Sequence, residues 1–350
     1  MAAFTSAAAL AAPVSVAGLD LPNRLVMAPM TRFHSPGGVP TAEVAAYYRR
    51  RAENGVGLII TEGTLIGHPT AGHETTVPRM TAGTAEAGWR RVTEAVHAAG
   101  GRIATQLWHL GSERDPADGL PSWTPSGLPT GAHAMTGADM GEIVAAFAES
   151  ARVAARAGFD AVEIHAAHGY LLDEFLWPET NRRTDAFGGS PARRAAFPAE
   201  IIRAVRAELP ASIPVIVRFS QFKERAYDAR IADSPDELAE ILTVLADAGA
   251  DVFHASQRRF WEPAFPGSPL NLAGWARKLT GRPTITVGSV GLTRDVPELP
   301  RLLSGLAGGE YDLVAAGRIL LGNPSWARLL LEARHSEIRD YQKSHEDRYF

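Results

Sequence analysis

The feature that most constrains the fold is the regular return of short apolar runs rich in β-branched residues. Most of these runs are continuously apolar, as expected for parallel strands that are buried on both faces. Stretches with a three-to-four apolar spacing separate them and predict helices. The runs are Arg24–Pro29, Gly57–Thr61, Arg102–Trp108, Ala161–His165, Val215–Ser220, Val252–Ser256, Thr284–Gly288 and Leu313–Gly317. Eight alternations without a linker predict an α/β fold, a single (β/α)8 TIM barrel over residues 1–350, with an open doubly wound sheet as the competing architecture.

Helix starts and long connections add detail to this prediction. A cap residue followed by proline, which is typical of a helix N-terminus, occurs at Ser190-Pro191, Ser234-Pro235 and Asn323-Pro324. Two connections exceed the common length of about 4–6 residues: residues 109–138 after the third strand and 166–189 after the fourth. Both leave the carboxyl ends of strands, where barrel enzymes build their active sites. We expect these loops to form the rim of a substrate site.

Composition excludes several classes of function. The chain has no cysteine, which excludes disulfides, a catalytic thiol and cysteine-ligated metal clusters. A net charge of −4 gives no electrostatic reason to expect a nucleic-acid partner. The alanine-rich N-terminus lacks the basic segment of a signal peptide, and no stretch approaches the roughly 20 apolar residues that cross a membrane. We therefore expect a soluble cytoplasmic protein without a membrane partner.

Glycine-bearing turns follow the seventh and eighth strands and predict a phosphate site. Barrels often bind phosphate at this place, because glycines let backbone N–H groups approach an anion closely. Gly288, Ser289 and Gly317 supply such amides, and Arg318 can add a charge-assisted hydrogen bond. The alternative is that these glycines only make tight turns. A phosphate site would not by itself identify the ligand.

Two histidines and a tyrosine lie close together after the fourth strand. The spacing of His165 and His168 can bring both imidazoles to one point, where they would stabilise an oxygen that gains negative charge. Tyr170 can deliver a proton. One alternative is a metal site completed by Asp173 and Glu174, although we expect no metal. Another is a pair of purely structural histidines.

At this point the sequence resembles the old yellow enzyme family of flavin-dependent ene-reductases over nearly its whole length. Each motif is weak alone, but all of them occur in order and at barrel spacing. The matching motifs are Asn23-Arg24 with Ala28-Pro29-Met30-Thr31-Arg32, Gln106-Leu107-Trp108-His109-Leu110-Gly111, His165-Ala166-Ala167-His168-Gly169-Tyr170-Leu171-Leu172, Asn181-Arg182-Arg183-Thr184-Asp185 with Phe187-Gly188-Gly189-Ser190, and Gly317-Arg318 with Asn323-Pro324.

The resemblance implies a bound FMN and assigns residues to it. Pro29, Met30 and Thr31 would lie along the flavin edge, and Gly63 would leave room for the ring. Gln106 would pair with the pyrimidine edge, and Arg218 would sit where negative charge gathers on the reduced ring. The phosphate would be held by Gly288, Ser289, Gly317 and Arg318.

The resemblance also implies the chemistry. His165 and His168 would hold the carbonyl oxygen of an activated alkene, and Tyr170 would protonate a carbon. NADPH or NADH would reduce the flavin and leave before the alkene enters, in a ping-pong order. The protein would be a monomer or a homo-oligomer. A desaturase or isomerase on the same fold remains an alternative, as does a flavin-free aldolase or isomerase, for which only Glu62 offers a catalytic group.

A few positions depart from the family pattern. Ser112 replaces the usual arginine after the Trp-His motif, and Phe33 stands where certain relatives have tyrosine. Thr31 is typical of the branches that carry threonine rather than cysteine. The pair Tyr349-Phe350 resembles an aromatic pair that packs near the flavin.

Overall fold

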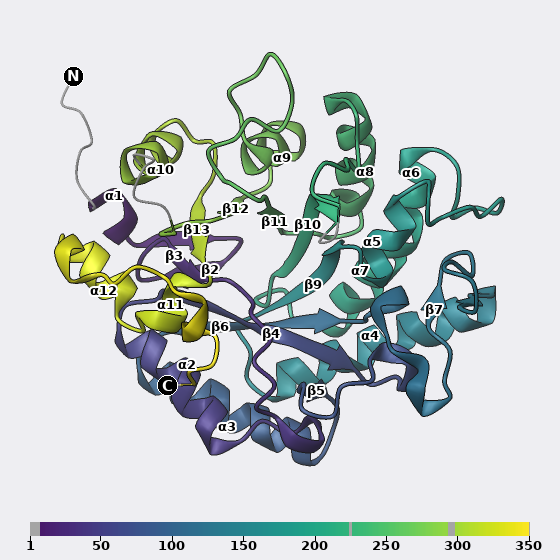
Figure 1. Ribbon diagram of the computed structural model, residues 1–350, viewed down its shortest axis with the longest axis horizontal. Coiled ribbons are helices and arrows are strands. Elements are labelled where there is room, and N and C mark those ends of the chain that lie inside the picture. Colours follow the sequence, from purple (N-terminus) through teal and green to yellow (C-terminus); the bar gives the residue numbers. More distant parts are fainter. Residues whose placement is uncertain (1–7, 224–225, 293–297, 350) are drawn as a thin grey trace.

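Eight parallel strands close into a barrel in the computed structural model, which describes residues 8–223, 226–292 and 298–349 (Figure 1). The strands follow the order β3-β13-β12-β11-β10-β9-β6-β4, and β3 also pairs with β4, which closes the ring. They are β3 (Leu25–Met27), β4 (Leu58–Ile66), β6 (Arg102–Trp108), β9 (Ala161–His168), β10 (Val215–Lys223), β11 (Val252–Ser256), β12 (Thr284–Val287) and β13 (Leu313–Ala316). The predicted (β/α)8 barrel is confirmed, and the open sheet is excluded.

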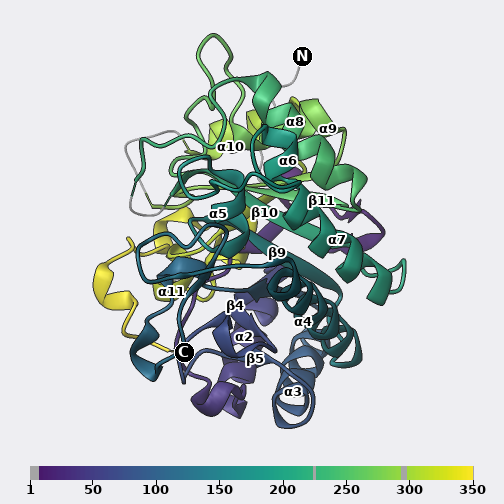
Figure 2. The ribbon, with the colours of Figure 1, turned by 90° about the vertical axis from the view of Figure 1, so that its right-hand side faces the viewer.

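Helices surround the barrel, as Figures 1 and 2 show from two sides. They are α1 (Ala8–Ala11), α2 (Ala42–Glu53), α3 (Thr84–Ala98), α4 (Gly137–Arg156), α5 (Leu171–Leu176), α6 (Pro191–Arg194), α7 (Ala196–Glu208), α8 (Pro235–Asp247), α9 (Leu272–Thr280), α10 (Glu298–Ala307), α11 (Ile319–Gly322) and α12 (Trp326–Leu331). None of the helices in the described ranges has the length and apolar character needed to cross a bilayer.

Two of the three predicted helix starts are confirmed. Ser190 and Ser234 cap α6 and α8, since each side chain accepts a backbone N–H three residues later. The prediction at Asn323 is wrong, because α12 begins at Trp326. The Asn323 side chain instead donates to the carbonyl of Arg339 and accepts from its N–H, which fixes the C-terminal segment to the barrel.

A short antiparallel hairpin covers the amino end of the barrel. It consists of β1 (Val14–Val16) and β2 (Leu19–Leu21). Its side chains Val16, Leu19 and Leu21 are buried together with inward-facing residues of the barrel strands. Because apolar side chains fill this end of the barrel, a ligand can enter only from the opposite end, where the strands terminate.

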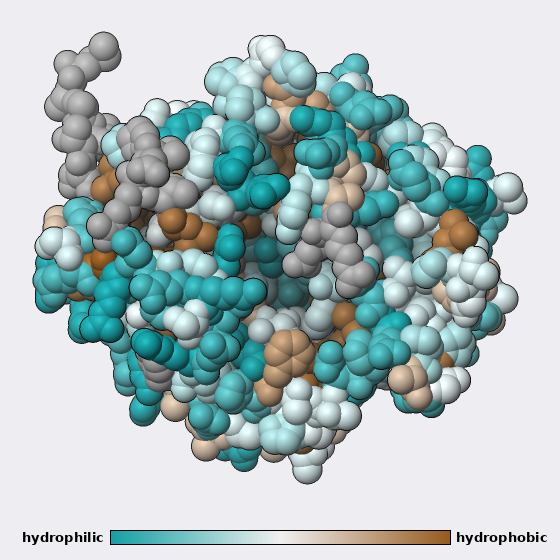
Figure 3. Space-filling view, in the orientation of Figure 1, coloured by the Kyte–Doolittle hydropathy of each residue, from teal (hydrophilic) through white to brown (hydrophobic). Residues whose placement is uncertain are grey.

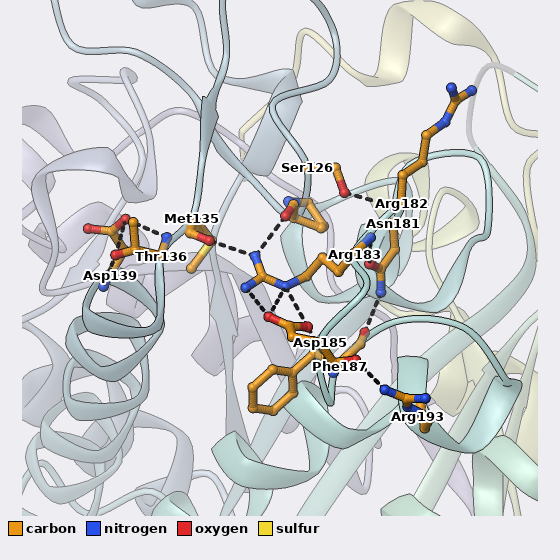
Figure 4. Close-up of polar contacts among 11 residues, drawn as sticks. Ser126, Met135, Thr136, Asp139, Asn181, Arg182, Arg183, Asp185, Phe187 and Arg193 are labelled. Atoms are coloured by element: carbon orange, nitrogen blue, oxygen red, sulfur yellow. Dashed lines mark hydrogen bonds and ion pairs between the residues drawn. The ribbon is translucent and has the colours of Figure 1, made fainter.

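The two long loops after β6 and β9 are joined to each other (Figure 4). The guanidinium of Arg183 donates to the carbonyls of Pro125 (2.9 Å) and Met135 (2.6 Å) and pairs with Asp185. The first loop also contains a small parallel sheet of β7 (Trp123–Thr124) and β8 (His133–Ala134). Within the predicted loop 166–189, β9 continues to His168 and α5 follows at Leu171, so the connection begins later than predicted. A further two-residue strand, β5 (Arg79–Met80), pairs with the end of β4.

Candidate active site

Two adjoining cavities, of about 440 and 770 Å³, lie at the carboxyl ends of the strands. Pro29, His168 and Arg218 line both of them, so the two form one site. The molecular surface is hollowed near the middle of the face in Figure 3, where most side chains are hydrophilic. The first cavity is also lined by the predicted residues Thr31, Gly63, Gln106, His165 and Tyr170, and the second by Met30, Gly288, Ser289, Gly317 and Arg318. The fold thus gathers every predicted site residue around one space.

His165 lies in β9 and offers the first cavity a hydrogen-bond donor. Burial lowers the pKa of this imidazole well below its ordinary value, so the ring is neutral near pH 7. Its Nδ1 accepts the backbone N–H of Ala167 at 3.3 Å. A neutral imidazole carries one hydrogen, and an accepting Nδ1 leaves that hydrogen on Nε2. His165 is therefore a donor through Nε2.

His168 and Tyr170 lie against His165. The ring centroids of the two histidines are 5.4 Å apart, and those of His165 and Tyr170 are 5.0 Å apart. Burial also lowers the pKa of His168 well below its usual range. Its backbone is in the left-handed region, with φ of 67°, a conformation that costs free energy in a non-glycine residue and clusters at functional sites. The predicted histidine pair and tyrosine thus meet at one wall of the cavity.

Gln106 is oriented by a buried carboxylate that the sequence interpretation missed. Its Nε2 donates to Glu163 Oε1 at 2.7 Å, and His254 Nδ1 lies 2.6 Å from Glu163 Oε2. All three side chains are buried. Because Glu163 Oε1 accepts the amide N–H, it fixes the Gln106 amide nitrogen and leaves the amide oxygen available to a ligand. A single carboxylate within the apolar strand 161–165 was the sequence signal for this network.

Glu62 anchors the segment that carries Thr31 through a hydrogen bond to the backbone of Arg32. This carboxylate accepts the backbone N–H of Arg32 at 2.9 Å, and Tyr48 Oη lies 3.5 Å from it. It is fully buried and lies outside the lining of both cavities, and burial raises its pKa to about 7. Glu62 is therefore a support for the loop. The flavin-free aldolase alternative needed it as a catalytic group and loses its basis.

The glycine turns line the second cavity, where they can offer backbone amides. A Cβ on Gly288 would lie 2.4 Å from the carbonyl oxygen of Gln257, so this glycine is also required for packing. The Ser289 hydroxyl donates to the carbonyl of Arg258 at 2.8 Å. What Ser289 can offer an anion is therefore its backbone N–H.

Asp173, Glu174 and Ser112 make hydrogen bonds within the protein. Asp173 Oδ2 accepts from Gly169 N and Trp177 Nε1, and Glu174 Oε1 accepts from Ser112 N. No cluster of three metal-ligating side chains occurs in the ranges that the structure describes. The second oxygens, Asp173 Oδ1 and Glu174 Oε2, are buried and have no hydrogen-bond partner among the described residues.

The C-terminal segment returns to the rim of the site. Tyr349 stacks between His34 (3.6 Å between ring centroids) and Tyr47 (4.5 Å), outside the lining of both cavities. Tyr341 and Glu346 do line the second cavity. Phe350 lies outside the described residues.

Comparisons with known proteins agree with this geometry. A sequence profile of the NADH:flavin oxidoreductase / NADH oxidase family matches residues 9–337. The chain is 34% identical over 342 residues to an NADH oxidase of Thermoanaerobacter brockii; the alignment covers 93% of this chain and 51% of that protein, so the chain spans about half of its length.

Solved structures are similar as well. The Old Yellow Enzyme from Pichia sp. AKU4542 superposes with a TM-score of 0.82 at 27% identity, covering 97% of this chain and 90% of that one. Morphinone reductase in complex with tetrahydroNAD superposes with a TM-score of 0.82 at 31% identity, covering 96% of this chain and 93% of the other.

Proposed function

The chain belongs to the NADH:flavin oxidoreductase / NADH oxidase family of FMN-dependent, nicotinamide-linked oxidoreductases, and from this premise we propose that it reduces the carbon–carbon double bond of α,β-unsaturated carbonyls and similar activated alkenes. The observation that carries the proposal is the neutral imidazole pair beside the flavin residues. The neutral His165 presents a donor, with His168 at the same wall, and a carbonyl oxygen that gains charge needs such donors.

The residues of the two cavities fit FMN. Four arginines and one carboxylate, Glu346, are among the described residues that line the second cavity, so this end suits the anionic phosphate. Gln106 directs an amide oxygen toward the other end, where the ring N–H of a pyrimidine would find an acceptor. A Cβ on Gly63 would lie 2.4 Å from the Trp108 ring, so only glycine keeps this wall of the first cavity flat.

Bound FMN supplies the acceptor and donor of two electrons. The protein's own residues bind the cofactor, bind the substrate and deliver a proton. Gln106, Arg218 and the Pro29–Thr31 segment orient the ring, and the Gly288–Ser289 and Gly317–Arg318 turns hold the phosphate. His165 Nε2–H binds the substrate's carbonyl oxygen and draws electron density from the double bond. The Tyr170 hydroxyl delivers a proton to the neighbouring carbon.

The proposed order of binding is ping-pong. Both the nicotinamide and the alkene must lie against the same ring, and the first cavity measures about 440 Å³. Since the two cannot occupy one contact surface together, the nicotinamide leaves before the alkene enters. This supports the ping-pong order.

The decisive experiment is an anaerobic two-step titration. The purified yellow protein should bleach on addition of NADH or NADPH, and the colour should return when cyclohexenone is added, with cyclohexanone as the product. If neither NADH nor NADPH bleaches the protein, the nicotinamide step is refuted. Bleaching without reoxidation by any enone would refute the alkene reduction and favour desaturation or isomerisation.

A further inference from the structure

Ser256 connects a flavin-side residue to a substrate-side residue. It is the last residue of β11, and it is buried. Arg218 Nη2, from β10, donates to its hydroxyl oxygen at 3.3 Å. His168 Nε2, from the end of β9, lies 2.8 Å from the same oxygen. Three adjacent strands thus place one hydroxyl between the arginine expected at the flavin and the histidine expected at the substrate.

Counting hydrogens fixes the direction of the first contact and limits that of the second. A guanidinium has no acceptor, so the Ser256 oxygen must accept from Arg218. The hydroxyl then has one hydrogen of its own, and a buried polar hydrogen almost always has an acceptor. Ser256 lines the second cavity, and the acceptor that the described residues place within hydrogen-bond distance of it is His168 Nε2, at 2.8 Å. A hydroxyl that donates to Nε2 makes Nε2 the unprotonated nitrogen of the ring.

From this we propose that Ser256 is a positioning residue, which sets the tautomer of His168 so that its Nδ1–H becomes the second donor to the substrate oxygen. The inference rests on the proposed alkene reduction for its functional meaning. In this arrangement Arg218 donates a hydrogen bond to Ser256, and Ser256 donates one to His168. His165 acquires its donor at Nε2 by a separate route, through Ala167 N. Together the two rings present two N–H groups, which matches the two lone pairs of a carbonyl oxygen.

The orientation of the His168 ring does not depend on Ser256 alone. The ring stacks on Phe222, with centroids 5.5 Å apart and planes 25° apart. The backbone N–H of His168 donates to Ser220 Oγ at 3.1 Å, and Ser220 Oγ donates to the carbonyl of Phe222. Removing the Ser256 hydroxyl should therefore change the protonation pattern of the ring while leaving the ring in place.

The proposal is tested by nitrogen NMR of the holoenzyme labelled with 15N-histidine, with the His168 signals assigned from a His168→Gln variant. The wild type should show a protonated Nδ1 and an unprotonated Nε2 at His168. Ser256→Ala should shift this ring toward the Nε2–H form, and Ser256→Thr, which keeps a hydroxyl, should restore the wild-type pattern. A wild-type ring protonated at Nε2, or a pattern unchanged in Ser256→Ala, would overturn the proposal.

Kinetics provide the second readout. Ser256→Ala should keep its FMN and raise the KM for cyclohexenone on the order of ten-fold, which corresponds to one lost hydrogen bond of about 1.4 kcal/mol. Ser150→Ala is the matched control, since this buried serine bonds to Met80 and Gly67, away from both cavities. An unchanged KM in Ser256→Ala would contradict the role in substrate binding. If the protein reduces no enone at all, the proposed function fails, but the NMR measurement still decides the tautomer.

Discussion

Replacing Glu163 with glutamine removes one of the two acceptor oxygens on which Gln106 and His254 depend. Both partners donate to the carboxylate, at 2.7 and 2.6 Å, and both are buried. Glutamine has one acceptor oxygen and one donor NH2 group. In one of the two contacts, two hydrogen-bond donors therefore face each other. His254 can move its hydrogen to Nε2, but that atom has no hydrogen-bond partner among the described residues. As long as the Gln106 amide keeps its present orientation, one buried donor is left without an acceptor.

The expected loss in the free energy of unfolding follows from the number of buried donors that lack an acceptor. A stranded buried donor costs about 1–3 kcal/mol, so Glu163→Gln should lower the free energy of unfolding by about this amount. Glu163→Leu leaves both donors without an acceptor, which should lower the free energy of unfolding by roughly twice as much, about 2–6 kcal/mol. Part of this loss is offset because the variant no longer buries a carboxylate. The Gln106 amide also becomes free to rotate, so FMN should bind more weakly in both variants.

The assay is urea unfolding of the FMN-free proteins, together with FMN titration followed by quenching of flavin fluorescence. Glu240→Gln is the control, because Glu240 is exposed and should change stability by less than about 0.5 kcal/mol. A loss below that value in Glu163→Gln, together with unchanged FMN affinity, would refute the view that this carboxylate orients Gln106.

Three other predictions concern the site and its surroundings. His165→Ala combined with His168→Ala should keep the yellow colour but lower enone turnover by about 10²-fold or more, because the donors for the carbonyl oxygen are gone; release of FMN on purification would show instead that the pair is structural. Gly63→Ala should displace the Trp108 ring, since the new Cβ would lie 2.4 Å from it, and cost about 1–3 kcal/mol with a lower flavin-to-protein absorbance ratio; full flavin content at wild-type melting temperature would contradict this. Burial raises the pKa of Glu174 to about 8, so the fold favours its protonated form, and stability should fall as pH rises from its ordinary pKa of 4.5 through about 8; Glu174→Gln should flatten the melting temperature over that window, and an unchanged slope would exclude this residue as the cause.

Much of the fold could be predicted because the signals are local. The predicted strands Arg102–Trp108 and Val252–Ser256 agree with the structure at both ends. The strand that was predicted to end at Thr61 continues to Ile66, because Gly63 to Leu65 still pair with β6 after a register shift and β5 pairs with the last two residues. Periodicity within the strand reveals neither the register shift nor the added partner. Asn323 failed as a cap for a similar reason, since its side chain bonds to Arg339.

The sequence alone determined the barrel and the residues that meet at its mouth. Alternating strands and helices bring the carboxyl ends of all strands to one face, where the polar residues of several strands meet. Only the tertiary structure decided how those side chains are oriented and protonated. The carboxylate that turns Gln106 lies 57 residues away in the chain, the one that holds Arg32 is 30 residues away, and the hydroxyl beside His168 is 88 residues away. A hydrogen bond depends on where both of its partners come to lie, and local patterns give the position of only one.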